Sequence, residues 1–551
     1  MPPTFHIENF GCRAARADGE AIAALLRSSG AKEHQLTEAD VVIVNTCSVT
    51  AEADREARAY IRRTHRLNPE ARIITTGCYA QRAPEELANI PGVSAVIGNS
   101  HKALAPEIAL SLANVAGNLH QRKAKSANIP VLVSGHDSGN SRSGSRAEKA
   151  TIDSWALAPE ASSAAPQLVT VSALLNASNS PLILADDTFA HSFLEEAPIA
   201  PGAQTRPNLK IQEGCSNRCS FCVIPQTRGN SRSLPAESIL SHVRSFIDAN
   251  GNELVLSGIN LGRWGRDLEG TGFSPYIDAT ESNRALALEG NSPPTLAALV
   301  RAILEQTSLP RLRLSSIEPM DWNVDLVALI SEYGGTKLAR HAHLPLQSGS
   351  DSVLRRMHRR YRPWHYAEKV DQLIRAGGPA LTFGADVMVG FPGETDHEFQ
   401  ETHDFIRSLP FGYLHLFPFS ARPGTRAWTL HAESPVSAAI VNERMSTLRD
   451  LAAEKTRMHR MQFIGAELDA ITLHTPPHLA FANRTSALTE NFLPVDLVAS
   501  LPANQLIRVR IIAVAADSTL LASPALSATS VADSRFIPQP ISEQTVFETA
   551  F

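Results

Sequence analysis

The feature that most restricts the fold is an alternation of strand-like and helix-like segments in the first hundred residues. Three short segments rich in Val, Ile and Thr have strand character, namely FHIENF, VVIVNT and RIITT. Between them lie two helix-like segments, DGEAIAALLRSSG and EADREARAYIRRTHRLN, the second with dense charge pairs at helical spacing. Such alternation is typical of a parallel sheet with crossover helices. We therefore predict an α/β domain over residues 1–102.

Three cysteines follow these predicted strands. Cys12 comes after FHIENFG, Cys47 after VVIVNT and Cys78 after RIITTG. The carboxyl ends of parallel strands share one edge of a sheet, where open α/β proteins bind ligands. We therefore expect the three thiols to converge. The alternative interpretation is that they are small residues of the core.

The middle of the chain changes character twice. Residues 103–205 are rich in Ser, Gly and Ala and are interpreted as a linker or insertion, partly disordered. From 206 to 430 the alternation resumes, and the six strand candidates are NLKIQEG, ELVLSGI, RLRLSS, HAHLPLQ, LTFGADVMVG and YLHLFPFS. Six such units predict an open or closed parallel barrel with function at the carboxyl ends of its strands. The stretch 266–293 is expected to be an extra loop.

The C-terminal part has a third character. A charged helix is predicted over 431–461, followed by strand-like LDAITLH, LPVDLVAS and LIRVRIIAV within 462–526, which predict a small β-barrel. Residues 527–551 are expected to form a tail. The predicted fold class is thus α/β, with an N-terminal parallel-sheet domain, a partial (β/α) barrel and a small C-terminal β-barrel.

A second cysteine group stands in EGCSNRCSFC, where Cys215, Cys219 and Cys222 have the spacing C-x3-C-x2-C. A four-iron cluster needs one ligand for each iron, so three cysteines leave one iron open to a substrate or cofactor atom. The alternative is a zinc site, which needs a fourth ligand, and no His follows at finger-like spacing. The spacing and the position on a βα unit favour an iron–sulfur cluster.

This triplet, following the first barrel strand, resembles the signature of radical S-adenosylmethionine enzymes. The segments NFGC, DVVIVNTCSVTAEAD, IITTGCYAQRAPEEL and KIQEGCSNRCSFCVIPQTRGNSRS are similar to those of the methylthiotransferases of that superfamily. The resemblance implies two [4Fe-4S] clusters and S-adenosyl-L-methionine as cofactors. It places one cluster on Cys215, Cys219 and Cys222, and the other on Cys12, Cys47 and Cys78.

The same resemblance assigns further residues to the cofactor. The predicted cofactor-binding residues are Phe221, Ser257, Gly258, Glu318, Gln347 and Asp386. Each has an ordinary structural alternative, such as core packing for Phe221 and hydrogen bonding at the barrel rim for Glu318 and Gln347.

Within the family, NTCSVT followed by EAD, together with SSIEP, most resembles the branch that adds a methylthio group to carbon-2 of N6-threonylcarbamoyladenosine in tRNA. The alternatives are the branch acting on isopentenyladenosine and, in another class, a zinc-stabilised RNA-binding protein without catalysis. One position departs from the family pattern: Ala15 stands where an Asn usually follows the first cysteine.

The charge balance, 51 basic against 56 acidic side chains, excludes a uniformly basic nucleic-acid coat but allows a local basic groove. RMHRRYRPWHY (356–366) and YIRRTHR (60–66) are candidate RNA contacts, or alternatively solvated helix faces. The expected partners are tRNA and an electron donor of the flavodoxin or ferredoxin type, with a monomeric chain. No apolar run of about 18 residues and no signal-peptide layout is found, so we expect no membrane span and a cytoplasmic location.

Overall fold

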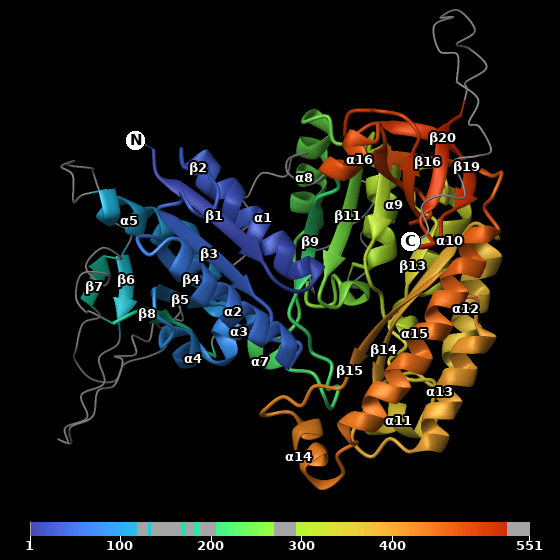
Figure 1. Ribbon diagram of the computed structural model, residues 1–551, viewed down its shortest axis with the longest axis horizontal. Helices are drawn as coiled ribbons and strands as arrows, with labels where there is room; N and C mark the ends of the chain where they lie inside the picture. The colour runs from blue at the N-terminus through green and yellow to red at the C-terminus, as the bar shows by residue number, and fades with distance from the viewer. Residues whose placement is uncertain are drawn as a thin grey trace, which may run out of the picture.

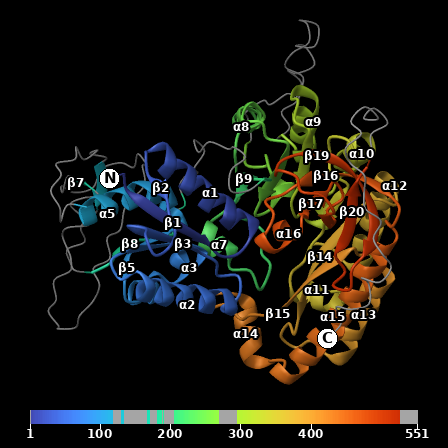
Figure 2. The same cartoon turned by 45° about the horizontal axis from the view of Figure 1, so that its top comes forward.

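The computed structural model describes residues 2–117, 130–133, 167–170, 180–187, 189, 205–268 and 294–525. The described chain forms an N-terminal lobe, a larger second lobe and a small barrel packed on the second lobe (Figures 1 and 2). The expected tail, most of the expected insertion and most of the expected loop lie outside these residues. No described helix combines the length and the apolar character that a membrane crossing requires.

The N-terminal lobe is a parallel sheet covered on both faces by helices. Its strands lie in the order β2-β1-β3-β4-β5-β8. Alternate residues of β3 face opposite sides, so Val42 and Val44 pack under α2, α3 and α4, whereas Val41 and Ile43 pack under α1 and α5. The elements of this lobe are β1 (Thr4–Asn9), α1 (Arg13–Ser28), β2 (Lys32–Glu33), β3 (Val41–Thr46), α2 (Ala51–Leu67), β4 (Arg72–Gly77), α3 (Cys78–Arg82), α4 (Pro84–Ala88), β5 (Val93–Gly98), η1 (Asn99–Leu104), α5 (Ala105–Gly117) and β8 (Leu182–Leu184).

Two elements of this lobe come from the segment expected to be a linker. Helix α5 packs its apolar face on the sheet, and strand β8 pairs in parallel with β5 at the edge. A short antiparallel pair, β6 (Pro130–Val133) with β7 (Gln167–Thr170), also lies in this segment. The run PLILADD thus adds a strand to a sheet that begins more than a hundred residues earlier in the chain.

The second lobe is an open (β/α) barrel, as predicted. One sheet has the order β10-β9-β11-β12 and the next β13-β14-β15, and a parallel bridge between Leu312 and Leu338 joins them. All six strand candidates form strands, and the two-residue β10, antiparallel to β9, is an addition. The elements are β9 (Asn208–Glu213), α7 (Ile224–Arg228), β10 (Arg232–Ser233), α8 (Ala236–Asp248), β11 (Glu253–Gly258), α9 (Leu296–Gln306), β12 (Arg311–Leu314), α10 (Val324–Tyr333), β13 (His341–His343), α11 (Asp351–Arg356), α12 (Pro363–Gly377), β14 (Thr382–Val389), α13 (Asp396–Ser408), β15 (Tyr413–Pro418) and α14 (Arg426–Glu433).

The long helix α15 (Ala438–Met461) leads to the C-terminal barrel, which closes in the order β16-β17-β18-β20-β19. Its elements are β16 (Glu467–Thr472), α16 (Pro477–Phe481), β17 (Thr485–Thr489), β18 (Pro494–Leu497), β19 (Leu506–Val514) and β20 (Leu520–Pro524). Polar contacts fix this barrel on the second lobe, because the buried Glu490 carboxylate accepts from the Arg340 guanidinium and Arg313 donates to the Thr489 carbonyl at 3.2 Å. The predicted fold class is confirmed.

Candidate active site

The N-terminal cysteines converge at the carboxyl edge of the sheet. Cys12 precedes α1, Cys47 directly follows β3, and Cys78 begins α3 directly after β4; β1, β3 and β4 are neighbours in the sheet. Gly11 has φ +98°, and a Cβ there would lie 2.6 Å from Cys47 Sγ, so the loop before Cys12 rests against Cys47. Burial, and then Cys78 and Cys12, raise the pKa of Cys47 to about 12.

The second cysteine trio lies in the loop between β9 and α7. Cys215 Sγ accepts hydrogen bonds from the Asn217 backbone N–H at 3.4 Å and from Asn260 Nδ2 at 3.7 Å. Burial, and then the neighbouring Cys219 and Cys215, raise the pKa of Cys222 to about 12. The three thiols of the trio therefore lie close enough to influence one another's ionisation.

A buried arginine touches this trio. Arg359 donates from Nη1 to Cys219 Sγ at 3.3 Å and from Nη2 to the Glu318 carboxylate. Burial by itself lowers the pKa of Arg359, but Tyr361, Glu318 and Cys219 raise it well above its usual value. The guanidinium thus stays charged beside the sulfur, which favours the thiolate form that binds iron.

This contact corrects, for its buried residues, the interpretation of 356–366 as an RNA-contacting or solvated surface. Arg359, Tyr361 and Tyr366 are buried, and the two phenol groups donate to backbone carbonyls of the barrel. His358, Arg360 and Trp364 are exposed, and RNA contact by these side chains stays a prediction. The pattern of Arg and Tyr gave no sign of this, because a run of charges is usually a surface.

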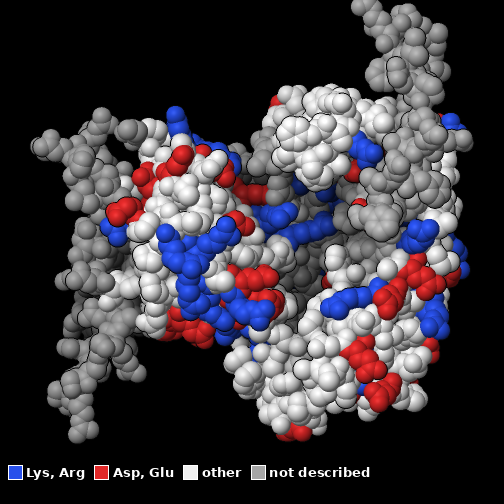
Figure 3. Space-filling view, viewed as in Figure 1, with Lys and Arg blue, Asp and Glu red and all other residues white. Residues whose placement is uncertain are grey.

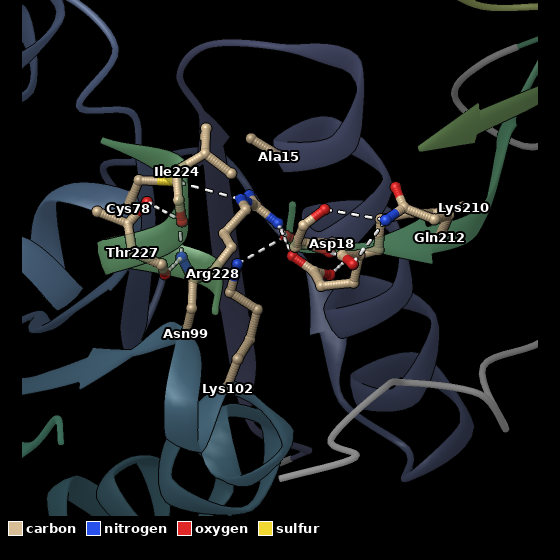
Figure 4. A network of polar contacts seen from close by, with 12 residues as sticks. Ala15, Asp18, Cys78, Asn99, Lys102, Lys210, Gln212, Ile224, Thr227 and Arg228 are labelled. Carbon is tan, nitrogen blue, oxygen red and sulfur yellow. Dashed lines mark hydrogen bonds and ion pairs between the residues drawn. The ribbon is translucent and has the colours of Figure 1, made fainter. Parts of the chain in front are cut away.

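A second buried arginine touches the N-terminal trio from the other lobe. Arg228, the last residue of α7, donates from Nε to Cys78 Sγ at 3.2 Å (Figure 4). Its guanidinium also pairs with Asp18 of α1 at 3.2 Å and with Glu213 of β9. Sequence reasoning missed this residue, although it stands in the motif CVIPQTRG.

Two lysines complete the network around Arg228. Lys102 of η1 donates to Asp18 at 2.6 Å, and Lys210 of β9 pairs with both Asp18 and Glu213 (Figure 4). All five side chains are buried, and three cations face two carboxylates. Burial by itself raises the pKa of Asp18, but the three cations lower it well below its usual value. The network therefore places an excess of positive charge next to Cys78.

The same network joins the two cysteine trios. Helix α7 begins two residues after Cys222 and ends at Arg228, and its five residues span about 7.5 Å. Asn99, from η1 of the first lobe, donates to Cys78 Sγ at 3.5 Å and to the Thr227 carbonyl of α7 at 2.8 Å. One short helix thus connects the two cysteine trios.

Asparagines support the N-terminal trio where Ala15 departs from the family pattern. Asn45 Nδ2 donates to the Ala15 carbonyl and to Asn9 Oδ1, which ties the first turn of α1 to β3. The buried Oδ1 atoms of Asn45 and Asn99 accept no hydrogen bond from any described residue. The Asn45 amide thus holds the main chain at residue 15, where alanine has no polar side chain to do so.

The predicted cofactor residues occupy the barrel rim and its core. Gln347, with φ +62°, donates its backbone N–H to the Asp386 carbonyl at 2.8 Å, and its buried Oε1 has no partner among the described residues. Ser257 is buried and donates to the Leu209 carbonyl at 3.4 Å, beside a bulge at Gly258. The half-buried Phe221 packs against the barrel core. Their roles toward the cofactor stay predictions.

The donor sets of both trios fit an iron–sulfur cluster. Each brings together three thiols, and each has one thiol that accepts a hydrogen bond from a charged, buried guanidinium, which suits an anionic cluster. Among the described residues, no group of three or more His, Cys, Asp or Glu side chains is arranged to hold a single metal ion.

Comparison with known proteins agrees with this geometry. Residues 209–406 match the radical SAM superfamily, and residues 4–98 match an uncharacterized protein family, UPF0004. The first match defines a radical S-adenosylmethionine enzyme, which uses that cofactor with a [4Fe-4S] cluster.

Relatives refine the class. The chain is 30% identical to the threonylcarbamoyladenosine tRNA methylthiotransferase MtaB of Bacillus subtilis, over 89% of this chain and 90% of the relative. It is 31% identical to the tRNA-2-methylthio-N(6)-dimethylallyladenosine synthase of Opitutus terrae, over 77% and 78%. A solved structure, the radical S-adenosylmethionine methyltransferase TsrM from Kitasatospora setae, is similar at 14% identity over 79% of this chain and 78% of that one, with a TM-score of 0.45. The chain belongs to the methylthiotransferase family of the radical S-adenosylmethionine superfamily.

Proposed function

We propose that this enzyme adds a methylthio group to carbon-2 of N6-threonylcarbamoyladenosine, next to the anticodon of tRNA. The observation that supports the proposal most strongly is the joining of two three-cysteine groups by α7, with Arg228 against one of them. The activity in the name of the Bacillus subtilis relative, which matches over 89% of this chain, supports the choice of nucleoside.

In this proposal each cysteine group holds one four-iron cluster. Cys215, Cys219 and Cys222 hold the cluster that binds S-adenosyl-L-methionine, and Cys12, Cys47 and Cys78 hold the second. When bound, these groups supply a 5′-deoxyadenosyl radical and the sulfur that is transferred. The barrel rim, with Ser257, Gly258, Glu318, Gln347, Asp386 and Phe221, orients the methionine cofactor.

The chain's own charges prepare both positions. Arg359 and Arg228 each donate to one cysteine sulfur and to at least one carboxylate, so each sulfur lies beside a fixed positive charge. Because burial alone raises the thiol pKa values, these guanidiniums and the asparagine donors offset the cost of forming thiolates inside the protein.

The tRNA is proposed to contact two basic regions. Figure 3 shows Lys and Arg gathered over the N-terminal lobe, and again in the hollow between the lobes. On α2, Arg55, Arg62 and Arg66 are exposed at helical spacing, which suits contacts with phosphates. The proposal also includes a monomeric enzyme acting in the cytoplasm, with electrons from a flavodoxin- or ferredoxin-type donor.

Modification of isopentenyladenosine is the second candidate, because the Opitutus terrae relative carries that activity in its name and is equally similar in identity. Mass spectrometry of tRNA nucleosides from a strain lacking the gene separates the two. Loss of the methylthio-threonylcarbamoyl nucleoside, restored by the intact gene and not by Cys215→Ala or Cys47→Ala, is the expected result. Loss of the methylthio-isopentenyl nucleoside instead would transfer the assignment to the second candidate.

Anaerobic purification tests the chemistry. We expect a brown protein that absorbs at about 400 nm and contains about eight irons per chain, four for each cluster. A colourless protein loaded with zinc would refute the enzyme and support the non-catalytic RNA-binding alternative.

A further inference from the structure

Three parts of the chain meet at one aromatic ring of the C-terminal barrel. Phe492, in the turn between β17 and β18 of the C-terminal barrel, lies under two guanidiniums: Arg13 at 5.7 Å and Arg313 at 5.3 Å from the ring centroid. Arg13 is the first residue of α1 and directly follows Cys12, whereas Arg313 comes from β12. Each of the three parts of the fold thus contributes one residue to this cluster.

The cluster has more positive charge than its own carboxylate balances. Glu253 is paired with Arg313 at 2.8 Å, Arg206 at 3.4 Å and Arg311 at 3.5 Å. The guanidinium of Arg13 has no hydrogen bond or ion pair with any described residue; it lies over the ring of Phe492 and interacts at longer range with Tyr413 and Glu253. Glu253 is thus the carboxylate partner of three guanidiniums, and Arg13 adds a fourth positive charge beside them.

The effect on neighbouring groups agrees with an excess of positive charge. Burial lowers the pKa of Arg206 to about 10. Repulsion by Arg313 and Arg13 adds to this effect, and attraction by Glu253 opposes it. The pKa of His341 lies well below its usual value, mainly because of burial and then because of repulsion by Arg313, Arg13, His343 and Arg206. A buried cationic cluster of this kind gains stability when an anionic ligand enters.

Aromatic rings lie beside the same cluster of guanidiniums. The ring centroids of His341 and Tyr413 lie 4.3 Å and 5.5 Å from that of Phe492, and His341 Nε2 lies 2.7 Å from the Tyr413 hydroxyl. The buried His341 Nδ1 has no partner among the described residues. Gly384 makes room for Tyr413, because a Cβ at residue 384 would lie 1.9 Å from that ring. Flat rings beside guanidiniums suit a planar base that carries an anionic group.

We propose that Arg13 and Arg313, held on Phe492, bind the carboxylate of the threonylcarbamoyl group and thereby select this anionic nucleoside over an apolar isopentenyl one. The inference rests on the proposed function and deepens it. An isopentenyl base in the same place brings no anion to Arg13, which has no carboxylate partner of its own, and this is the type of mismatch that gives strong discrimination. The location of the cluster agrees with the proposed reaction, because Arg13 directly follows Cys12, a residue of the group proposed to hold the transferred sulfur.

The rival ligand for these cations is an RNA phosphate, and binding experiments separate the two. The probes are anticodon stem-loop RNAs that carry N6-threonylcarbamoyladenosine, its neutral methyl ester or isopentenyladenosine, titrated into the iron-loaded enzyme and followed by fluorescence anisotropy. The unaltered enzyme is expected to bind the carboxylate form about 30-fold more tightly than the ester, in the range measured for charged hydrogen bonds.

The Arg13→Gln variant is expected to lose most of this preference, because carboxylate binding weakens while ester binding stays within about twofold. Arg16→Gln is the matched control, because Arg16 lies one turn further along α1 and is exposed. If Arg13→Gln weakens all three RNAs equally and lowers the salt dependence by about one phosphate contact, the carboxylate assignment is wrong.

Phe492→Leu keeps the experiment decisive if Arg13→Gln loses iron. This variant changes a residue of the C-terminal barrel that is not next to any cysteine in the sequence, and it removes the ring that holds both guanidiniums, so a fall of about fivefold in carboxylate preference is expected. An unchanged preference would overturn the inference. Failure of the unaltered enzyme to modify the threonylcarbamoyl RNA would refute the proposed function, whereas equal modification of acid and ester would refute only the carboxylate site.

Discussion

At the scale of single residues, two arginines do for the cysteine groups what the cysteines cannot do alone. A guanidinium presents several N–H donors in one plane, so it can reach a sulfur and a carboxylate at the same time. Arg359 joins Cys219 to Glu318, and Arg228 joins Cys78 to Asp18 and Glu213. A lysine in either place would have the charge, but its compact ammonium lacks the planar spread of donors that lets one guanidinium reach groups on different sides.

The first prediction concerns Arg359. Arg359→Gln removes a positive charge next to Cys219, which destabilises the more negative, reduced form of the barrel cluster. Its reduction potential is expected to fall by about 60 mV, equivalent to about 1.4 kcal/mol for one electron. Titration followed by electron paramagnetic resonance measures this, with Arg360→Gln as control because that neighbour is more exposed and contacts no cysteine. Equal potentials for the two variants would contradict the assigned role.

The second prediction concerns the buried network of Arg228. Arg228→Gln leaves Asp18 and Glu213 with only the two lysines, and breaking a buried ion pair costs about 3–5 kcal/mol. The apparent Tm is therefore expected to fall by about 10 °C. Asp18→Asn should cost a similar amount, and the double variant should cost less than the sum, because the two side chains share one interaction. Additive effects would show that they act independently.

At the scale of elements, helix α1 carries a carboxyl group whose pKa the fold raises toward neutral pH. Burial raises the pKa of Glu20 to about 7 from its ordinary value of 4.5, and its Oε1 has no partner among the described residues. The ionised form is thus less favourable in the folded protein than in the unfolded chain. Glu20 weakens the fold progressively as the pH rises from 4.5 through 7.

The third prediction follows from the direction of the Glu20 pKa shift. Glu20→Gln should leave the free energy of unfolding nearly unchanged at pH 4.5 and raise it at pH 8 by about 3 kcal/mol, from about 1.4 kcal/mol for each pKa unit. Denaturant unfolding across this pH range measures the difference. Glu33→Gln is the control, because that side chain is exposed and pairs with Arg27. A stabilisation independent of pH would show that the effect of Glu20→Gln is one of packing.

The sequence predicted the main elements well, for physical reasons. Strands such as VVIVNT are continuous apolar runs because both faces of a parallel sheet are covered, and a cysteine directly after such a run must lie at the sheet edge. The edge strand β8 was less visible, because its LIL core is short and follows a long polar segment. The two residues of β10 are too few for any periodicity.

The buried arginines could not be predicted in this way. Arg359 stands among RMHRRYRPWHY, and nothing in the local pattern distinguishes it from Arg360, which lies nearer the surface. Its burial depends on Glu318 and Cys219, which are 41 and 140 residues away in the chain. Such contacts are set by the tertiary fold, so the sequence indicated the cysteines and Glu318 as site residues but not the arginines that join them.

At the scale of the whole molecule, the proposed reaction needs the two lobes to hold their cysteine groups in register. Besides Arg228, a second clamp joins the lobes at Asp54 of α2. Its buried carboxylate accepts from Arg82 of the same lobe at 2.9 Å and from Arg422, in the loop after β15, at 2.7 Å. The Ala51 backbone N–H donates to Ser420 of the same loop at 2.9 Å.

The fourth prediction uses this clamp to separate radical formation from sulfur transfer. Asp54→Asn leaves two buried guanidiniums without their carboxylate and lets the lobes shift, while the barrel cysteines and Arg359 stay in place. We expect cleavage of S-adenosyl-L-methionine to continue and methylthio product to decrease, so that 5′-deoxyadenosine formed per product rises about tenfold or more.

Chromatographic measurement of both products tests this expectation, with Glu52→Gln as the matched control because Glu52 lies on the same helix and pairs only with Arg55 at the surface. The expected uncoupling follows from geometry, because a small displacement of one lobe changes the distance between the two cysteine groups and leaves each group intact. If Asp54→Asn lowers both products in the same proportion, the clamp supports the fold as a whole, and the register of the lobes does not depend on it.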